Sequence, residues 1–331
     1  MMSQICLCYH PTTTLFIDDN QNFLDTLQFE FKNKLIGQYY QDPLKALQFL
    51  VSEYQPNSFT QRCFIDPSHE QSDQLFSQID LRQIHQQASL VERFMEVSVC
   101  VIDYTMPGIN GLELSRKIKE IYPNIRILLL TGEADHNLAV QAFNEGVIDK
   151  FFKKSSFDLI ETLYLAIQEL TYKYFMSLSQ TITNHMNSDR FKRLRDPVLI
   201  DLFTTLCQEK DIAEYYLIND SGSFLLLDRQ GYPYWLAFVD SDELNGFVEY
   251  AELEEAPSSI IDALKNKVKI PFFYTDRDLT TPPFQWENHL YPAEQLRGLG
   301  TYYYALIEKS VANEWYPEHV VSYKTYVSHQ L

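Results

Sequence analysis

Residues 97–114, VSVCVIDYTMPGINGLEL, decide how the first half of this chain folds. The run from Val97 to Ile102 is almost continuously apolar and rich in valine and isoleucine, as is typical of a strand buried on both faces of a parallel sheet. Asp103 follows at once, and a turn containing one proline and two glycines then leads into an amphipathic helix. The segment therefore predicts a strand, a loop and a helix, with a carboxylate where the strand ends.

The same alternation of strand and helix repeats on both sides of this segment. The stretches TLFIDD (14–19), IGQYY (36–40), IRILLLTG (125–132) and IDKFFKK (148–154) have the apolar or β-branched composition of strands, and helical patterns separate them. Five such strands with intervening helices predict an α/β fold: a doubly wound, five-stranded parallel sheet covered by helices on both faces.

The length of 331 residues is sufficient for two hydrophobic cores. We expect the parallel-sheet domain to span 1–155, with an insertion at about 51–96 where the alternation is interrupted. A long connecting helix should occupy 156–195. Residues 196–331 should form an α+β output domain, because AEYYLI, SFLLLD and YPYWLAFVD are strand-like and are separated by turn signals.

The connecting helix carries a narrow apolar seam. Its members are spaced four and three residues apart, a pattern that suits packing against the chain's own domain as well as pairing with a second copy of the helix. Both alternatives stay open, and we predict a homodimer that uses this helix. The seam consists of Leu163, Ile167, Leu170 and Tyr174.

Charge and composition narrow the possible partners. The net charge is −18, and residues 1–170 and 171–331 carry −9 each. Nucleic-acid binding depends on clustered cations, so this balance makes a DNA-binding output unlikely and equally disfavours an anionic membrane surface. No apolar run reaches transmembrane length and no signal peptide is evident, which predicts a cytoplasmic protein. The five scattered cysteines are expected to be reduced thiols.

Functional side chains gather where the predicted strands end. Carboxyl ends of parallel strands meet along one edge of the sheet, where α/β proteins form their sites. A carboxylate cluster suits a hard cation such as Mg²⁺, a carboxylate can act as a nucleophile toward phosphorus, and a lysine and a hydroxyl can bind phosphoryl oxygens. The residues at these ends are Asp18, Asp19, Asp103, Thr131 and Lys153.

These segments carry a family resemblance. FIDDN, VIDYTMPGINGLEL, LLLTGEAD and GVIDKFFKKS resemble the signature segments of receiver domains of bacterial two-component response regulators, which have a flavodoxin-like fold. The resemblance implies that Asp103 is the phosphoacceptor and that Thr131 and Lys153 contact the phosphoryl group. It also implies a loop beside the acceptor that is shaped by Pro107, Gly108 and Gly111.

The resemblance further implies a cofactor and partners. Mg²⁺ would be held by Asp18, Asp19, Asp103 and the backbone carbonyl of Thr105. The phosphoryl donor would be a sensor histidine kinase or a phosphotransfer protein. The texture of the chain, rich in phenylalanine, tyrosine and glutamine and joined to an unusual output domain, also resembles Legionella quorum-sensing response regulators.

Two positions depart from the family pattern. The aromatic switch residue three positions before Lys153 is replaced by Lys150, so aromatic rotation is not expected to report phosphorylation. The proline of the family's Lys-Pro step is replaced by Lys154, which leaves the geometry of that step open.

The output domain has no glycine-rich phosphate loop, zinc-ligand spacing or helix-turn-helix with a basic recognition helix. We therefore predict a protein- or ligand-binding output rather than an enzyme. The alternatives are an enzyme gated by the receiver, with an uncharted C-terminal active site, and, less favoured by charge, a DNA-binding regulator. The aromatic residues Tyr232, Tyr234, Trp235 and Phe238 could line a ligand pocket or form core.

Overall fold

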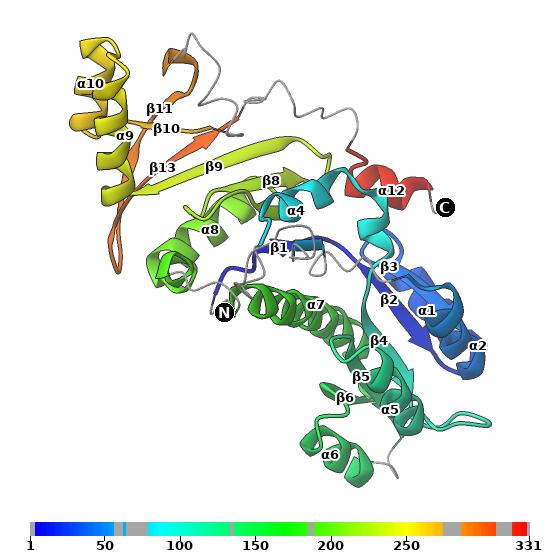
Figure 1. Ribbon diagram of the computed structural model, residues 1–331. Coiled ribbons are helices and arrows are strands. Elements are labelled where there is room, and N and C mark those ends of the chain that lie inside the picture. The colour runs from blue at the N-terminus through cyan, green and yellow to red at the C-terminus, as the bar shows by residue number, and fades with distance from the viewer. Residues whose placement is uncertain are drawn as a thin grey trace, which may run out of the picture. The chain divides into compact units, whose positions relative to one another are not determined.

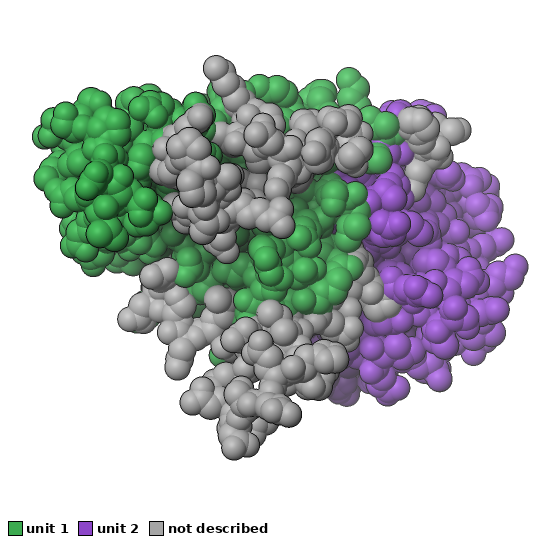
Figure 2. Space-filling model, turned by 45° about the horizontal axis from the view of Figure 1, so that its top comes forward, with its two compact units in different colours: residues 1–9, 59–90, 182–325 green, residues 10–58, 91–181, 326–331 purple. Residues whose placement is uncertain are grey.

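Two large separate sheets form the framework of the protein (Figure 1). The computed structural model describes residues 4–55, 62–63, 79–132, 136–184, 189–273, 286–308 and 320–329. The chain divides into two compact units, coloured in Figure 2. The parallel-sheet unit contains 10–58, 91–181 and 326–331, and the antiparallel-sheet unit contains 1–9, 59–90 and 182–325.

The first sheet has five parallel strands, as the sequence predicts. Its order is β3-β2-β4-β5-β6. The central strand, β4, is buried along its whole length, which explains its apolar sequence. The strands are β2 (Thr13–Ile17), β3 (Ile36–Tyr40), β4 (Val97–Asp103), β5 (Arg126–Thr131) and β6 (Lys150–Lys153).

Helices cover both faces of this sheet (Figure 1). One face packs against α1 (Gln21–Phe31) and α7 (Leu159–Thr183). The other packs against α2 (Pro43–Gln48), α5 (Gly111–Ile121) and α6 (His136–Asn144). A π-helical turn (Phe49–Glu53) extends α2. The doubly wound α/β prediction is therefore confirmed.

The apolar seam of α7 lies inside this unit. Leu163, Ile167 and Leu170 are buried in the same core cluster as Phe16 and Leu130 of the sheet. Tyr174 is buried as well, and its hydroxyl donates a hydrogen bond to Glu96. The seam is thus used for packing within the chain, and the prediction that it pairs two copies is wrong for this surface. The helical periodicity was the same for both alternatives, so only the structure separates them.

The second sheet is antiparallel and has six strands in the order β1-β7-β8-β9-β13-β12. With the helices beside it, it confirms the α+β prediction. The strands are β1 (Cys8–Tyr9), β7 (Ile212–Leu217), β8 (Phe224–Asp228), β9 (Pro233–Asp240), β12 (Glu294–Arg297) and β13 (Thr301–Ile307), and β10 (Lys269–Pro271) and β11 (Leu290–Pro292) form a separate two-stranded ladder. The helices of this unit are α4 (Arg82–His85), α8 (Pro197–Glu209), α9 (Ser241–Leu253) and α10 (Ser258–Lys265), with 3₁₀ turns at Gln86–Ser89, Asp189–Arg195 (η5) and Trp286–Asn288. The 3₁₀ turn Val91–Met95 belongs to the parallel-sheet unit, and the residues of α12 (Tyr323–His329) are divided between the two units.

The division into units differs from the predicted cuts at 155 and 196. The first nine residues belong to the antiparallel-sheet unit, where β1 pairs with β7. The middle of the predicted insertion, 59–90, belongs there too, and its helix α4 packs against β7. Residues 56–61 and 64–78 of that insertion lie outside the described residues. A two-residue strand has no periodicity, so its distant partner could not be read from the sequence.

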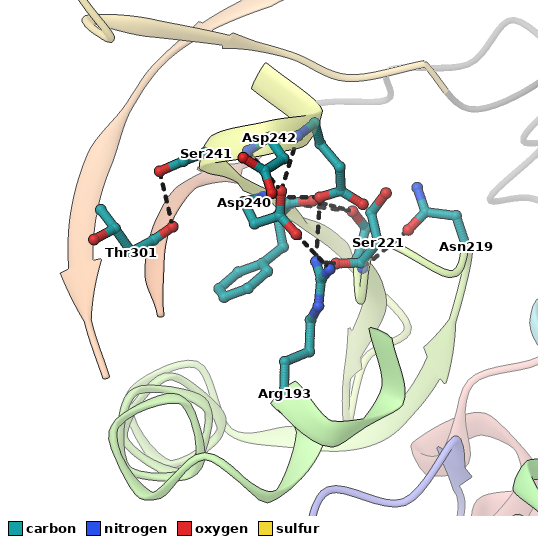
Figure 3. A network of polar contacts seen from close by, with 10 residues as sticks. Arg193, Asn219, Ser221, Asp240, Ser241, Asp242 and Thr301 are labelled. Atoms are coloured by element: carbon teal, nitrogen blue, oxygen red, sulfur yellow. Dashed lines mark hydrogen bonds and ion pairs between the residues drawn. The ribbon is translucent and has the colours of Figure 1, made fainter. Parts of the chain in front are cut away.

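A buried arginine joins three parts of the antiparallel-sheet unit (Figure 3). Arg193 lies in η5, and its guanidinium donates to the carbonyl of Ser221 (2.6 Å), to Asp240 Oδ2 (2.9 Å) and to Glu243 Oε2 (3.2 Å). Asp240 and Glu243 also form the capping box of α9, in which each side chain accepts a hydrogen bond from the other residue's backbone N–H. The arginine therefore ties η5 to the β7–β8 turn and to the start of α9.

The aromatic residues of β9 are mostly core. Trp235 and Phe238 are buried, whereas Tyr232, just before the strand, is exposed and Tyr234 is partly exposed. Of the two interpretations of this segment, the structure favours packing for the two buried rings. Among the helices within the described ranges, none is both long and apolar enough to cross a lipid bilayer.

Candidate phosphoryl-acceptor site

Three carboxylates meet at the carboxyl end of the parallel sheet. The β2–β4 register pairs Ile17 with Ile102, which brings Asp18 and Asp103 side by side at the next position. Oxygens of Asp18, Asp19 and Asp103 all lie within 4.8 Å of one another. Asp18 and Asp103 are buried, and Asp19 is the more accessible of the three. The strand ends thus bring together the acids that the sequence singled out.

The loop after Asp103 depends on its glycines. Gly108 has a φ of +83°, a conformation that favours glycine. A Cβ atom on Gly111 would lie 2.1 Å from the backbone oxygen of Asp103, so no side chain fits there. Asn110 caps α5 by accepting a hydrogen bond from the backbone N–H of Glu113 at 2.9 Å. These features fix the loop tightly against the end of β4.

The lysine that contacts these carboxylates is Lys154, whereas the sequence singled out Lys153, whose contact with a phosphoryl group stays a prediction. The ammonium of Lys154 lies 2.6 Å from Asp18 Oδ2 and 2.9 Å from Asp103 Oδ1. Lys153 is the last residue of β6, pairs with Thr131 and is exposed. Side chains of neighbouring residues in an extended chain point to opposite sides. The residue after the strand therefore faces the carboxylates while the aligned lysine faces away.

Thr131 and Thr105 occupy the positions that the sequence suggests. Thr131 ends β5, the strand beside β4, and is fully buried, with its hydroxyl 3.4 Å from the carbonyl of Phe152. The backbone N–H of Lys154 donates to the carbonyl of Thr131 at 3.1 Å, which anchors the lysine beside the threonine. Thr105 is exposed in the loop two residues after Asp103. The roles of the Thr131 hydroxyl and the Thr105 carbonyl remain predictions.

The electrostatics of the cluster favour an additional cation. Burial raises the pKa of Asp103 to about 6, opposed by the bonded ammonium of Lys154 and assisted by the charges of Asp18 and Asp19. Burial alone would lower the pKa of Lys154, but its bonds to Asp18 and Asp103 outweigh burial and the pKa is raised. Among the described residues, the ammonium of Lys154 is thus paired with two members of a cluster of three carboxyl groups, which leaves the cluster with an excess of negative charge.

The residues fit a magnesium ion. Mg²⁺ prefers oxygen ligands at about 2.0–2.1 Å, so two oxygens on opposite sides of one ion lie about 4 Å apart. The carboxylate oxygens of Asp18, Asp19 and Asp103 are already gathered within a slightly larger span. Asp18, Asp19 and Asp103 would hold the ion, which would supply positive charge next to incoming phosphoryl oxygens.

The position of the missing aromatic switch carries an ion pair. Lys150, at the start of β6, pairs with Glu169 of α7, and Lys173 of the same helix binds the second oxygen of Glu169 at 2.9 Å. The ring of Phe151 instead packs on the other face of the sheet, the one covered by α2, α5 and α6, with its centroid 6.3 Å from that of the Phe143 ring. The ion pair between Lys150 and Glu169 therefore connects β6, the strand that precedes Lys154, to α7.

Comparison with known proteins agrees with this geometry. Residues 72–164 match the response regulator receiver domain family. The structure of the Legionella pneumophila response regulator LqsR is 32% identical in sequence and superimposes with a TM-score of 0.81, over 99% of this chain and 97% of that one. The chain belongs to the response regulators. The likeness to LqsR extends through the antiparallel-sheet unit, so both units of this response regulator have a counterpart in one solved structure.

Curated relatives match a smaller part of this response regulator. The DNA-binding transcriptional regulator NtrC of Escherichia coli is 30% identical over 127 residues, which are 38% of this chain and 26% of NtrC. The C4-dicarboxylate transport transcriptional regulatory protein DctD of Pseudomonas aeruginosa is 45% identical over 51 residues, which are 15% of this chain and 11% of DctD. The chain spans about a quarter or less of the length of these relatives.

Proposed function

We propose that this response regulator is a signalling switch that is phosphorylated on Asp103 with Mg²⁺ bound by Asp18, Asp19, Asp103 and the carbonyl of Thr105. The observation that carries the proposal is the convergence of three carboxylates and one ammonium at the ends of β2, β4 and β6. Membership of the response regulators supports a phosphohistidine of a sensor kinase or phosphotransfer protein as the donor.

The proposed chemistry is a transfer of one phosphoryl group. A carboxylate oxygen of Asp103 attacks phosphorus and forms an O–P bond while the P–N bond of the phosphohistidine breaks and its electron pair stays on the imidazole nitrogen. Lys154 stands beside Asp103 and places positive charge at the developing phosphoryl oxygens. Thr131, at the end of the next strand, supplies a hydroxyl that can donate to the same oxygens.

Labelling the purified chain tests this proposal. Acetyl phosphate with MgCl₂ should add one phosphoryl group, visible as a mass increase that hydroxylamine removes, as expected for an acyl phosphate. Asp103→Asn should abolish the mass increase, and EDTA should prevent it in the unaltered chain. A partly exposed acid on the same unit, Glu30, provides the matched control, because it lies in α1, outside the acid cluster, and Glu30→Gln should label at the normal rate. Undiminished labelling of Asp103→Asn would refute the assignment.

We further propose that the antiparallel-sheet unit is a binding module for a protein or a small ligand. The net charge of −9 on residues 171–331 supports this over a DNA-binding output, although NtrC, which resembles the receiver part, is a DNA-binding regulator. A gel-shift titration with duplex DNA at physiological salt should show no tight complex. A receiver-gated enzyme is the alternative, and turnover that appears only after phosphorylation of Asp103 would favour it. Cytoplasmic location, homodimerisation and a role in quorum sensing remain predictions.

A further inference from the structure

The ammonium of Lys154 lies where a metal ion would need its ligands. It contacts Asp18 Oδ2 at 2.6 Å and Asp103 Oδ1 at 2.9 Å. The other oxygen of Asp18, Oδ1, accepts a hydrogen bond from the backbone N–H of Asn20 at 3.0 Å. Oδ2 is therefore the oxygen of Asp18 that can best serve a metal ion, and it is the one that Lys154 binds.

We propose that Lys154 is the internal counter-cation of the acid cluster and that it competes with Mg²⁺ for Asp18. When the metal site fills, Lys154 gives up Asp18, keeps Asp103 and becomes available to phosphoryl oxygens. This inference rests on the proposed function, since it assumes that Asp18 is a metal ligand. It adds that the metal affinity of this chain depends on Lys154, the residue after Lys153, which is the position that aligns with the family's lysine.

Charge and geometry support the competition. Two cations on one carboxylate oxygen repel each other, most strongly in a site screened from water, and Asp18 is almost fully buried. The side chain of Lys154 is 28% exposed, so its flexible stem has room to move. The ring of Phe23 lies 5.1 Å from the ammonium, so Lys154 keeps a cation–π partner as well as Asp103 when it leaves Asp18.

Calorimetric titration of the full chain with MgCl₂ tests this inference. Lys154→Gln should bind Mg²⁺ about tenfold more tightly than the unaltered chain, which corresponds to ~1.4 kcal/mol of relieved repulsion. Lys153→Gln is the matched control: it removes the same charge from the adjacent, exposed position and should change the dissociation constant less than about threefold. Equal or weaker binding by Lys154→Gln, or equal tightening by both variants, would overturn the competition.

Thermal melting provides a second readout that does not depend on activity. In EDTA, Lys154→Gln should melt at a lower temperature than the unaltered chain, because the carboxylates of Asp18 and Asp103 lose their neighbouring cation. In MgCl₂ the difference should largely disappear, and a loss that is the same with and without metal would contradict the inference. If Asp103 is labelled normally but Mg²⁺ affinity does not respond to Lys154, only this inference fails. If Asp103 is never labelled while Lys154→Gln still tightens Mg²⁺ binding, the proposed function fails and the competition stands.

Discussion

Replacement of Arg193 by methionine should destabilise the antiparallel-sheet unit strongly. The side chain of Arg193 is only 6% exposed, and its guanidinium binds the Ser221 carbonyl and the carboxylates of Asp240 and Glu243. Methionine has a similar length and leaves the apolar stem largely in place. The variant therefore removes the cation and little else, and leaves two partly buried carboxylates facing each other.

The magnitude follows from the burial of these groups. Breaking a fully buried ion pair by removing one partner costs about 3–5 kcal/mol. The side chains of Glu243 and Asp240 are 14% and 30% exposed, so water partly screens them and the lower part of that range applies. We expect a loss of about 3 kcal/mol in the free energy of unfolding. At a urea dependence of about 2 kcal/mol/M, the midpoint should fall by about 1.5 M.

Tryptophan fluorescence in urea measures this unit specifically, because every tryptophan of the chain lies between residues 182 and 325: Trp235, Trp286 and Trp315. The control is Arg229→Met, which removes an exposed ion pair with Asp211 and should cost less than about 1 kcal/mol. Adding Glu243→Gln to Arg193→Met should recover part of the loss, because one unpaired charge disappears while a glutamine can still serve the capping box. A loss for Arg193→Met no larger than that of the control would refute this account of the network.

Two substitutions in the parallel-sheet unit, Gly111→Ala and Leu163→Asp, are each compared with a control variant. Gly111→Ala should lower the free energy of unfolding by about 1–3 kcal/mol and displace Asp103, because the new methyl group would clash with the Asp103 carbonyl. Its control, Gly246→Ala in α9, has no atom near the new methyl group and should raise the free energy of unfolding by about 1 kcal/mol. Urea unfolding of both variants distinguishes these opposite signs. Leu163→Asp should unfold the parallel-sheet unit because it buries a charge, and circular dichroism would report the loss of helix. Its control, Phe157→Asp, changes a fully exposed side chain and should leave the unit folded. If Leu163→Asp stays folded and changes only the sedimentation coefficient, the seam is a dimer contact after all.

The acid cluster could be predicted from the sequence because each of its members follows a recognisable strand. Asp103 ends seven buried residues, and Asp18 follows five more, so the parallel topology alone brings their carboxylates to one edge. The sequence also points to Gly111 by its place in the loop, although the reason, its close approach to the Asp103 carbonyl, is visible only in the structure. Strand ends in a parallel sheet are thus positions where sequence order determines spatial proximity.

Long-range pairing set the limit of the sequence interpretation. Cys8 and Tyr9 align with Tyr216 and Tyr215 in β7, about two hundred residues away, and two residues carry no pattern from which a strand or its partner can be inferred. The seam of α7 does have a helical pattern, but an apolar stripe predicts only that the stripe is buried and does not identify the surface that buries it. In this protein the covering surface is the chain's own sheet, through Phe16, Leu130 and their neighbours.

The choice between Lys153 and Lys154 shows why alignment and geometry can give different residues. Alignment counts positions from the glycine before β6 and selects Lys153. The sheet instead fixes side-chain direction by the ladder, in which Lys153 pairs with Thr131 and the N–H of Lys154 then donates to the Thr131 carbonyl. A proline after the strand has no cation and no N–H, so a chain with proline there has neither this bond nor a second lysine. With Lys154 in that place, this chain has two lysines on opposite sides of one strand end, and the one that contacts Asp18 and Asp103 determines the charge of the site.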